Sequence, residues 1–483
     1  MEQFTSTVES QVIPLSSVDM LSGTANTPSA AFYQNTDAVG NFMPSDQLKT
    51  AFYLALKAFP ILAGRLRQSG NGRFSMVVDK DNLNMPEYLE STSDIHYKDI
   101  KSAGFDKRAW PSGVATVESI MAPDANGIIR TANVHIVRLK DNSGLILFLS
   151  IIHCVVDGFS YFTFLNHWAA VCKAMRNGAV ESPRSLIEFT FDRSIIEENL
   201  PTECKQLNAT RSSIFAHPSL FSKWLACVSP QTRGRILSLL TSLTKSETHV
   251  FHMADSTLET LRSSVREFMP GGMRLSDNDV LVALLSKTYA QAQRSEKENG
   301  GNAVTLVLGS IGSAIFGGLF EAEVHQATGM ACDIRPRIGI VDKNYVGSPQ
   351  IVPFVRNSLD DLLTLTTPES LASIASNVRK CIDNVNAPYV GTFIETMDSA
   401  PSSFVHLSVH LMKHHTDFIA SNQTRFKMFE ADFGDGCQDW VAFIREIPGI
   451  VTFRPCPPPL KGVGSECVSQ PLSLRGFSRT SFG

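Results

Sequence analysis

The sequence has little of what would place it at a membrane, on nucleic acid or outside the cell. Its first twenty residues contain no basic stretch followed by an apolar one, so they do not predict a secretory signal. Lysine and arginine number 43 against 47 aspartates and glutamates, and the net charge of -4 offers no basic field for phosphate backbones or anionic lipid. We therefore expect no nucleic-acid partner, no membrane attachment and a cytoplasmic location.

Paired cysteines and convincing long apolar runs are also missing. The 9 cysteines are odd in number and scattered, which is typical of reduced thiols rather than of a disulfide framework. One uncharged stretch, residues 303–320, has the length of a membrane span. Four glycines and several hydroxyl residues dilute it, so we predict a buried strand, Val304–Leu308, that runs into a glycine-rich loop.

The chain does contain enough apolar residues to form the core of a large folded protein. The chain has 483 residues, of which 43% are hydrophobic and 19% charged, and no repeat of 20 to 50 residues is apparent. Helical periodicity begins at Ser45 and again at Gly158, whereas residues 74–78, 132–139 and 145–152 have the apolar patterns of strands. These patterns predict a mixed α/β fold.

Composition also divides the chain. Residues 1–185 and 219–483 each read as an α/β half, and residues 186–218 are polar and proline-interrupted, as in a crossover linker. The segment 460–483 is rich in serine and arginine and has no helical period. We expect this tail to be poorly ordered.

The residues after the predicted strand at 145–152 carry the clearest chemistry. The strand leads to His153, then to Asp157 and Gly158, where a helix begins. An imidazole at the end of a buried strand is well placed as a general base, because its ordinary pKa lies near neutral pH. Gly158 would permit a tight backbone turn. The structural alternative is a buried histidine satisfied by hydrogen bonds, with Asp157 capping the helix.

Two other arrangements are weaker candidates. Cys154 beside His153 has the composition of a nucleophile pair, but alternation along a strand would point Cys154 into the core if His153 faces the site. His406, His410 and His414 have the spacing of one helix face and could ligate zinc. Because no cysteine and only one carboxylate accompany them, a polar helix stripe is favoured and no metal site is predicted.

The His-x-x-x-Asp-Gly segment resembles the hallmark of the BAHD acyltransferase family, and five further segments resemble its other signatures in the same order. They are Pro60–Leu66, Asp192–Ser194, Ser276–Asp279, Asp333–Arg337 and Asp432–Gly436. The last reads DFGDG where the family has DFGWG, so Asp435 stands in place of tryptophan. Spacing and length are most similar to fungal secondary-metabolite members such as trichothecene acetyltransferases.

The resemblance implies two chloramphenicol-acetyltransferase-like domains, with mixed β-sheets flanked by helices and an active-site channel between them. In such a monomeric enzyme His153 would take the proton of an acceptor hydroxyl, and the oxygen would attack the thioester of acetyl-CoA or another acyl-CoA. No cofactor would be bound. The acceptor would be a small hydrophobic metabolite.

The resemblance also implies roles for other residues. Asp157 would orient the site through an ion pair with an arginine of the Asp333–Arg337 strand, for which we choose Arg335 over Arg337. The last signature would be mainly structural, and three polar residues would help to shape a mostly apolar channel. The signature residues are Asp432, Gly434 and Gly436, and the channel residues are Ser276, Ser421 and Asn422.

Two other functions stay open. A nonribosomal-type condensation enzyme shares an HHxxxDG core, although Ile152 occupies the first histidine position here and the enzyme would need carrier-bound substrates. A non-catalytic binding relative is the other, because Asp435 and the tail depart from the family pattern. The acceptor itself cannot be read from the sequence.

Overall fold

The computed structural model describes most of the chain. The described residues are 2–5, 7–22, 26–68, 74–113, 129–178, 188–200, 228, 232, 247–298, 325–340, 344–399, 418–444 and 449–469. The expected strand and loop within 303–320 and the histidines at 406, 410 and 414 lie outside these residues. Within them, no helix combines the length and apolarity needed to cross a membrane.

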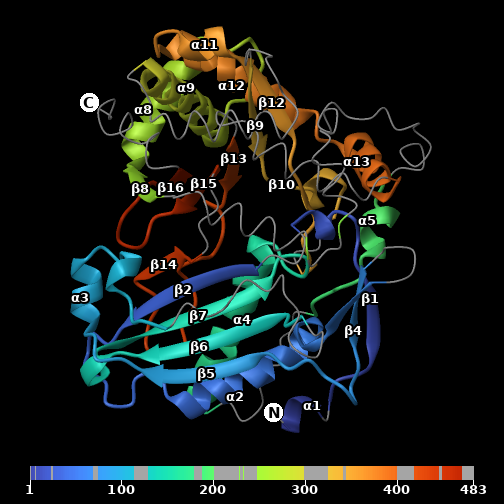
Figure 1. Cartoon of the computed structure of the whole chain (residues 1–483), viewed down its shortest axis with the longest axis vertical. Coiled ribbons are helices and arrows are strands. Elements are labelled where there is room, and N and C mark those ends of the chain that lie inside the picture. The colour runs from blue at the N-terminus through green and yellow to red at the C-terminus, as the bar shows by residue number, and fades with distance from the viewer. Residues whose placement is uncertain are drawn as a thin grey trace.

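A five-stranded mixed sheet forms the lower part of the molecule in Figure 1, in the order β14-β2-β7-β6-β5. The strands are β2 (Asn26–Gln34), β5 (Glu87–Thr92), β6 (Ala132–Arg138), β7 (Gly144–Ile152) and β14 (Trp440–Phe443). All nine residues of β7 are buried. One face packs on α2 (Ser45–Ala55) and α4 (Gly158–Arg176), and the other on α3 (Tyr97–Ser102). This double cover explains why β7 is almost entirely apolar instead of alternating.

A six-stranded mixed sheet forms the upper part, in the order β12-β9-β13-β15-β16-β8. Its strands are β8 (Glu247–Met253), β9 (His325–Met330), β12 (Phe354–Ser358), β13 (Phe418–Asn422), β15 (Ile450–Pro455) and β16 (Val463–Ser469). Helices α8 (Asp255–Arg266), α9 (Asp277–Glu298) and α12 (Pro368–Asp383) bury their apolar residues against it. The short α11 (Leu359–Leu363) packs beside α9.

Smaller elements complete the described fold. A three-stranded sheet has the order β1-β4-β3, and a two-stranded sheet pairs β10 with β11. The bounds are α1 (Glu2–Thr5), β1 (Gln11–Pro14), β3 (Arg65–Gln68), β4 (Phe74–Val78), α5 (Ser194–Glu198), β10 (Cys332–Asp333), β11 (Gln350–Ile351) and α13 (Ala387–Ser399). The predicted α/β class is confirmed, and the helices predicted from Ser45 and Gly158 are α2 and α4.

The two parts exchange segments, so the division in sequence is not the division in space. Strand β14 comes from the second half but pairs antiparallel with β2, as the red and blue strands in Figure 1 show. Conversely, Val18 and Leu21 from the first half pack among apolar residues of the second. Arg454 of β15 holds the exchanged strand, because its guanidinium donates to the Val441 carbonyl at 3.1 Å.

The expectation of a poorly ordered tail is wrong for its first residues. Val463–Ser469 forms β16, which pairs antiparallel with β15 on one side and β8 on the other. A strand with both edges paired is an interior member of its sheet, and backbone hydrogen bonds there do not require a helical period or an apolar composition. Residues 470–483 lie outside the described part of the chain.

Candidate active site

His153 stands one residue beyond the end of β7. Its side chain is partly exposed, and its Nδ1 lies 3.2 Å from the Oγ of Ser348. Cys154 is fully buried in the core beneath α4, and this burial raises the pKa of its thiol to about 12. The neighbouring positions therefore differ as chemical groups: an accessible imidazole, and a protonated thiol enclosed by apolar residues.

Asp157 performs two structural tasks behind His153. Its Oδ1 accepts the Ser160 N–H at 2.8 Å and caps α4, and its Oδ2 pairs with Arg335 Nη1 at 2.7 Å. Burial by itself raises the pKa of the Asp157 carboxyl, but the Arg335 guanidinium and the hydrogen bonds from Arg335 and Ser160 bring it below its ordinary value. Asp157 therefore caps the helix, as the structural alternative predicted, and also forms the ion pair that the resemblance implied.

Arg335 reaches Asp157 from a short 3-10 helix, not from the expected strand. Strand β10 ends at Asp333, and Arg335–Arg337 is helical around Pro336, which has no N–H to contribute to a strand ladder. Arg337 turns elsewhere and donates to the Ile382 carbonyl at 2.9 Å. The choice of Arg335 as the partner of Asp157 therefore agrees with the structure, although the local conformation was wrong.

Gly158 is required for space, not for a turn. It is the first residue of α4 and its φ is not in the left-handed region. A Cβ at this position would lie only 2.3 Å from Cε2 of Phe426. Glycine here lets the start of α4 approach Phe426, which packs against the main core of the first sheet.

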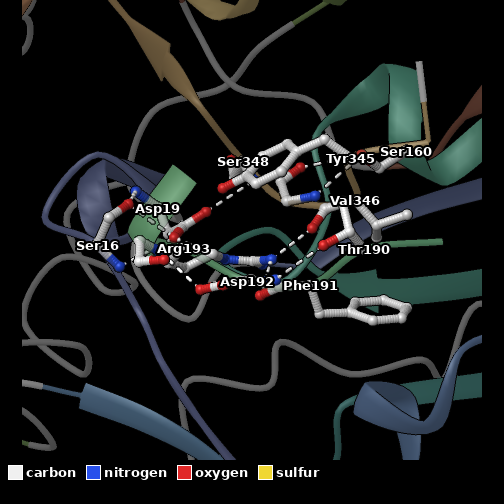
Figure 2. Close-up of polar contacts among 12 residues, drawn as sticks. Ser16, Asp19, Ser160, Thr190, Phe191, Asp192, Arg193, Tyr345, Val346 and Ser348 are labelled. Atoms are coloured by element: carbon white, nitrogen blue, oxygen red, sulfur yellow. Dashed lines mark hydrogen bonds and ion pairs between the residues drawn. The ribbon is translucent and has the colours of Figure 1, made fainter. Parts of the chain in front are cut away.

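A second buried ion pair lies beside the first, and the sequence analysis assigned no role to it. Asp19 Oδ2 accepts from Arg193 Nε at 3.1 Å and from the Ser16 hydroxyl at 2.7 Å. Arg193 belongs to the Asp192–Ser194 signature within the expected linker, of which residues 188–200 are described. Figure 2 shows both side chains directed toward the segment that contains Tyr345, Val346 and Ser348.

That segment connects both ion pairs with His153. Arg193 Nη1 donates to the Val346 carbonyl, and the Ser348 N–H donates to Asp19 Oδ1 at 2.8 Å. The ring of Tyr345 lies 5.4 Å from the Arg193 guanidinium and 5.5 Å from that of Arg335. Within the second ion pair and this segment, only Arg193 belongs to a recognised signature, since a Ser-x-x-Asp pattern such as Ser16–Asp19 is common at turns and helix starts.

The DFGDG segment packs against the far end of α4. Asp432 Oδ2 pairs with Lys173 at 2.6 Å, and its Oδ1 accepts the N–H groups of Gly434 at 2.8 Å and Gly436 at 3.1 Å. The two glycines have φ values of 109° and 104°, which favour residues without a Cβ. The described contacts of Asp432 join the DFGDG loop to α4 and to itself.

Asp435, the departure from the family pattern, has its own partners. It forms an ion pair with Arg176 in the last turn of α4, and its Oδ2 accepts the Met43 N–H at 2.7 Å. A carboxylate replaces the indole without leaving a buried charge unpaired. The replacement of tryptophan by Asp435 therefore does not indicate a damaged fold.

The three expected channel residues gather where β13 meets α9. Asn422 Nδ2 donates to Asn278 Oδ1 at 3.1 Å, which joins the end of β13 to the first turn of α9. The hydroxyl and the N–H of Ser276 both donate to Asp279 Oδ2 at 2.8 Å, while the Ser421 hydroxyl accepts from Gln423 at 3.2 Å. These hydrogen bonds give each residue a local structural task.

The arrangement around His153 can perform acid–base chemistry. An imidazole engaged at Nδ1 can accept a proton at its other nitrogen. Asp157 does not touch it in any contact that the structure gives, so the carboxylate acts on the loop and helix rather than on the ring. Among the described residues, no group of His, Cys, Asp and Glu is arranged to hold a metal ion.

Comparison with known proteins identifies a family and a related sequence. The model of the Transferase family matches residues 5–446. BAHD acyltransferase DCR from Arabidopsis thaliana is 27% identical over 139 residues, and this match spans 27% of the chain and 27% of the relative's own length.

Solved structures share the fold along the whole chain. F. graminearum TRI101 complexed with ethyl coenzyme A has a TM-score of 0.68 and 13% identity, covering 98% of this chain and 97% of that one. TRI101 has also been crystallised with coenzyme A and deoxynivalenol. Vinorine synthase has a TM-score of 0.59 and 14% identity, covering 97% and 95%. At these identities the likeness shows the fold alone.

Proposed function

Because this chain belongs to the Transferase family, the family of BAHD acyltransferases, and is therefore an acyltransferase, we propose that it moves an acetyl group from acetyl-CoA to a hydroxyl of a small hydrophobic metabolite. The coenzyme A and deoxynivalenol bound to the structurally similar TRI101 support both halves of this reaction class. We expect the protein to act as a monomer in the cytoplasm.

The observation that carries the proposal is the surroundings of His153. A partly exposed imidazole stands at the end of a fully buried strand, and the segment behind it is fixed by the Asp157–Arg335 ion pair. The residues in this pair are 178 positions apart, so the site forms only when the two halves of the chain pack together. A catalytic base needs this kind of fixed position.

The proposed reaction is a direct transfer. His153 Nε2 removes the acceptor's hydroxyl proton while the acceptor oxygen attacks the thioester carbonyl carbon. The tetrahedral intermediate then expels the CoA thiolate, which takes the proton back from the imidazolium. A C–O bond forms, a C–S bond breaks, and His153 ends in its starting protonation state. No acyl-enzyme is required.

Cys154 is the competing nucleophile, and its environment argues against it. A covalent mechanism needs a thiolate in contact with substrate. The thiol of Cys154 is fully buried, and a pKa of about 12 keeps it protonated at neutral pH. We therefore assign no covalent step to it.

Release of free thiol from acetyl-CoA tests the function. The purified protein is incubated with acetyl-CoA and a panel of hydroxylated polycyclic metabolites, and acylated product is identified by mass. We expect thiol release that requires an acceptor, and a fall in kcat of roughly 10²- to 10⁴-fold in His153→Ala. The matched control is Cys154→Ala, which should keep kcat within about twofold.

The competing functions give different results in the same assay. If activity is lost in Cys154→Ala and kept in His153→Ala, the direct mechanism is wrong. Turnover only with acyl groups on a carrier protein would favour the condensation enzyme. Binding of acceptors without thiol release under any condition would favour the non-catalytic relative.

A further inference from the structure

The side chain of Ser348 touches the ring of His153. Its Oγ lies 3.2 Å from Nδ1, and Ser348 itself is completely buried. A hydroxyl can donate to a ring nitrogen or accept from it, so this contact can select which nitrogen carries the proton. A general base acting through Nε2 needs the proton on Nδ1, with the Ser348 oxygen as its acceptor.

The position of Ser348 is set by Asp19. The Ser348 N–H donates to Asp19 Oδ1 at 2.8 Å across 329 sequence positions. The other carboxylate oxygen of Asp19 is held by Arg193 and by the N–H and hydroxyl of Ser16. Asp19 is completely buried, so water cannot replace these hydrogen-bond partners.

The residues just before Ser348 are fixed as well. Gly347 donates to the Ser160 hydroxyl at 3.2 Å, and its carbonyl accepts the Asp157 N–H at 2.8 Å. A Cβ on Gly347 would lie 3.1 Å from Cζ of Arg193, so glycine allows that guanidinium to pack closely. The segment therefore lies between the two ion pairs, as Figure 2 shows for its Arg193 side.

We propose that Ser348 holds His153 in the tautomer protonated at Nδ1, and that Asp19 and Arg193 are positioning residues that act through Ser348. The inference rests on the proposed role of His153 as the base. The chain of contacts runs from Arg193 to Asp19, to the Ser348 backbone, and from its hydroxyl to the imidazole. Arg193, Asp19 and Ser348 are all buried, which holds the Ser348 hydroxyl in a fixed position beside the ring.

The first test separates positioning from substrate binding. Ser348→Ala removes one oxygen atom and should lower kcat roughly tenfold, because the ring loses its fixed tautomer and orientation. The KM values for acetyl-CoA and acceptor should stay within about twofold, since Ser348 acts on the base. A Ser348→Ala enzyme with unchanged kcat overturns the inference.

Asp19 is tested by comparing two substitutions. Asp19→Asn retains an oxygen that can accept the Ser348 N–H and should keep more activity than Asp19→Ala, whose kcat should fall roughly tenfold. If Asp19→Ala does not fold, Asp19→Ala/Arg193→Met removes both charges and takes its place. Combining either with Ser348→Ala should give no further loss, because both act through the same hydroxyl. Additive losses would overturn the role of Asp19.

Nitrogen NMR of histidine-labelled protein gives a readout that does not depend on turnover. At about pH 8.5, where an ordinary imidazole is neutral, we expect His153 to carry its proton on Nδ1 and to shift toward a tautomer mixture in Ser348→Ala. The signal is assigned by its loss in His153→Ala. Protonation at Nε2 in the unaltered protein, or no change in Ser348→Ala, overturns the inference.

The two readouts distinguish this inference from the proposed function. If the unaltered protein releases no thiol but the tautomer shifts as expected, the function has failed and the positioning stands. The matched control is Asp435→Asn, another buried carboxylate that holds a backbone N–H and an arginine but has no described contact with His153. It should leave the His153 signal and kcat unchanged.

Discussion

Two clusters of paired charges hold this protein together in different surroundings. The junction cluster consists of Asp19, Asp157, Arg193 and Arg335, whose side chains are 0% to 8% exposed. The DFGDG cluster consists of Lys173, Arg176, Asp432 and Asp435, whose side chains range from 6% to 50% exposed. Similar pairs of residue types therefore experience very different dielectric environments.

The difference indicates what each cluster contributes. In water an ion pair adds little stability, but a buried charge that loses its partner is costly because no solvent replaces it. The junction cluster joins segments from both halves of the chain directly behind His153. The DFGDG cluster attaches one loop to the end of α4. We expect damage to the first to affect activity and folding together, and damage to the second to affect folding alone.

The largest effect should come from breaking the junction cluster at Arg335. Arg335→Gln leaves Asp157 buried without its partner, so the free energy of unfolding should fall by about 3–5 kcal/mol, and kcat should fall with it. Urea denaturation and thiol release measure the two effects. Arg337→Gln is the matched control, because Arg337 touches the Ile382 carbonyl instead. Equal effects of the two variants would contradict the assigned importance of the pair.

A smaller effect should follow in the DFGDG cluster from Asp435→Asn. Arg176 loses its charged partner, but it is partly exposed and water can reach it. We expect the free energy of unfolding to fall by about 1–3 kcal/mol with kcat within about twofold of the unaltered enzyme. Loss of kcat without loss of stability would show that this cluster also supports the site, and the contrast between the clusters would fail.

The smallest effect, at Asp432, should depend on pH. Burial raises the pKa of its carboxyl, but the hydrogen bonds from Lys173, Gly434 and Gly436 outweigh this and leave the pKa below its ordinary value. A pKa lower in the folded than in the unfolded state stabilises the protein above the unfolded value, near 4, and this stabilisation is lost as pH falls through the folded value.

Urea unfolding as a function of pH checks this sign. Asp432→Asn should lower the stability at pH 7 slightly, and the difference from the unaltered protein should disappear as the medium becomes more acidic than about pH 4. A difference that stays constant, or grows on acidification, would show that the carboxylate charge of Asp432 is not what stabilises this loop.

Much of the fold could be predicted because its signals are local. Strand β7 and the start of helix α4 follow from an apolar run and from helical periodicity after His153, and the predicted strand at 145–152 and helix start at Gly158 agree with the structure within one residue. The ion pair of Asp157 with Arg335 required the family resemblance, since nothing in either segment indicates its partner. The conformation around Arg335 was missed because Pro336 breaks the strand that the motif implied.

By itself, the sequence determined the α/β class, the principal elements around His153 and the order of the signatures, because periodicity and short motifs depend on neighbours in the chain. Only the tertiary structure decided that Asp19 and Ser348 meet, that β14 joins the first sheet and that Asp435 finds Arg176. These partners are separated by hundreds of residues, and packing alone brings them within hydrogen-bond distance. The strand β16 illustrates the same cause, since its place in the sheet is set by β15 and β8 on either side.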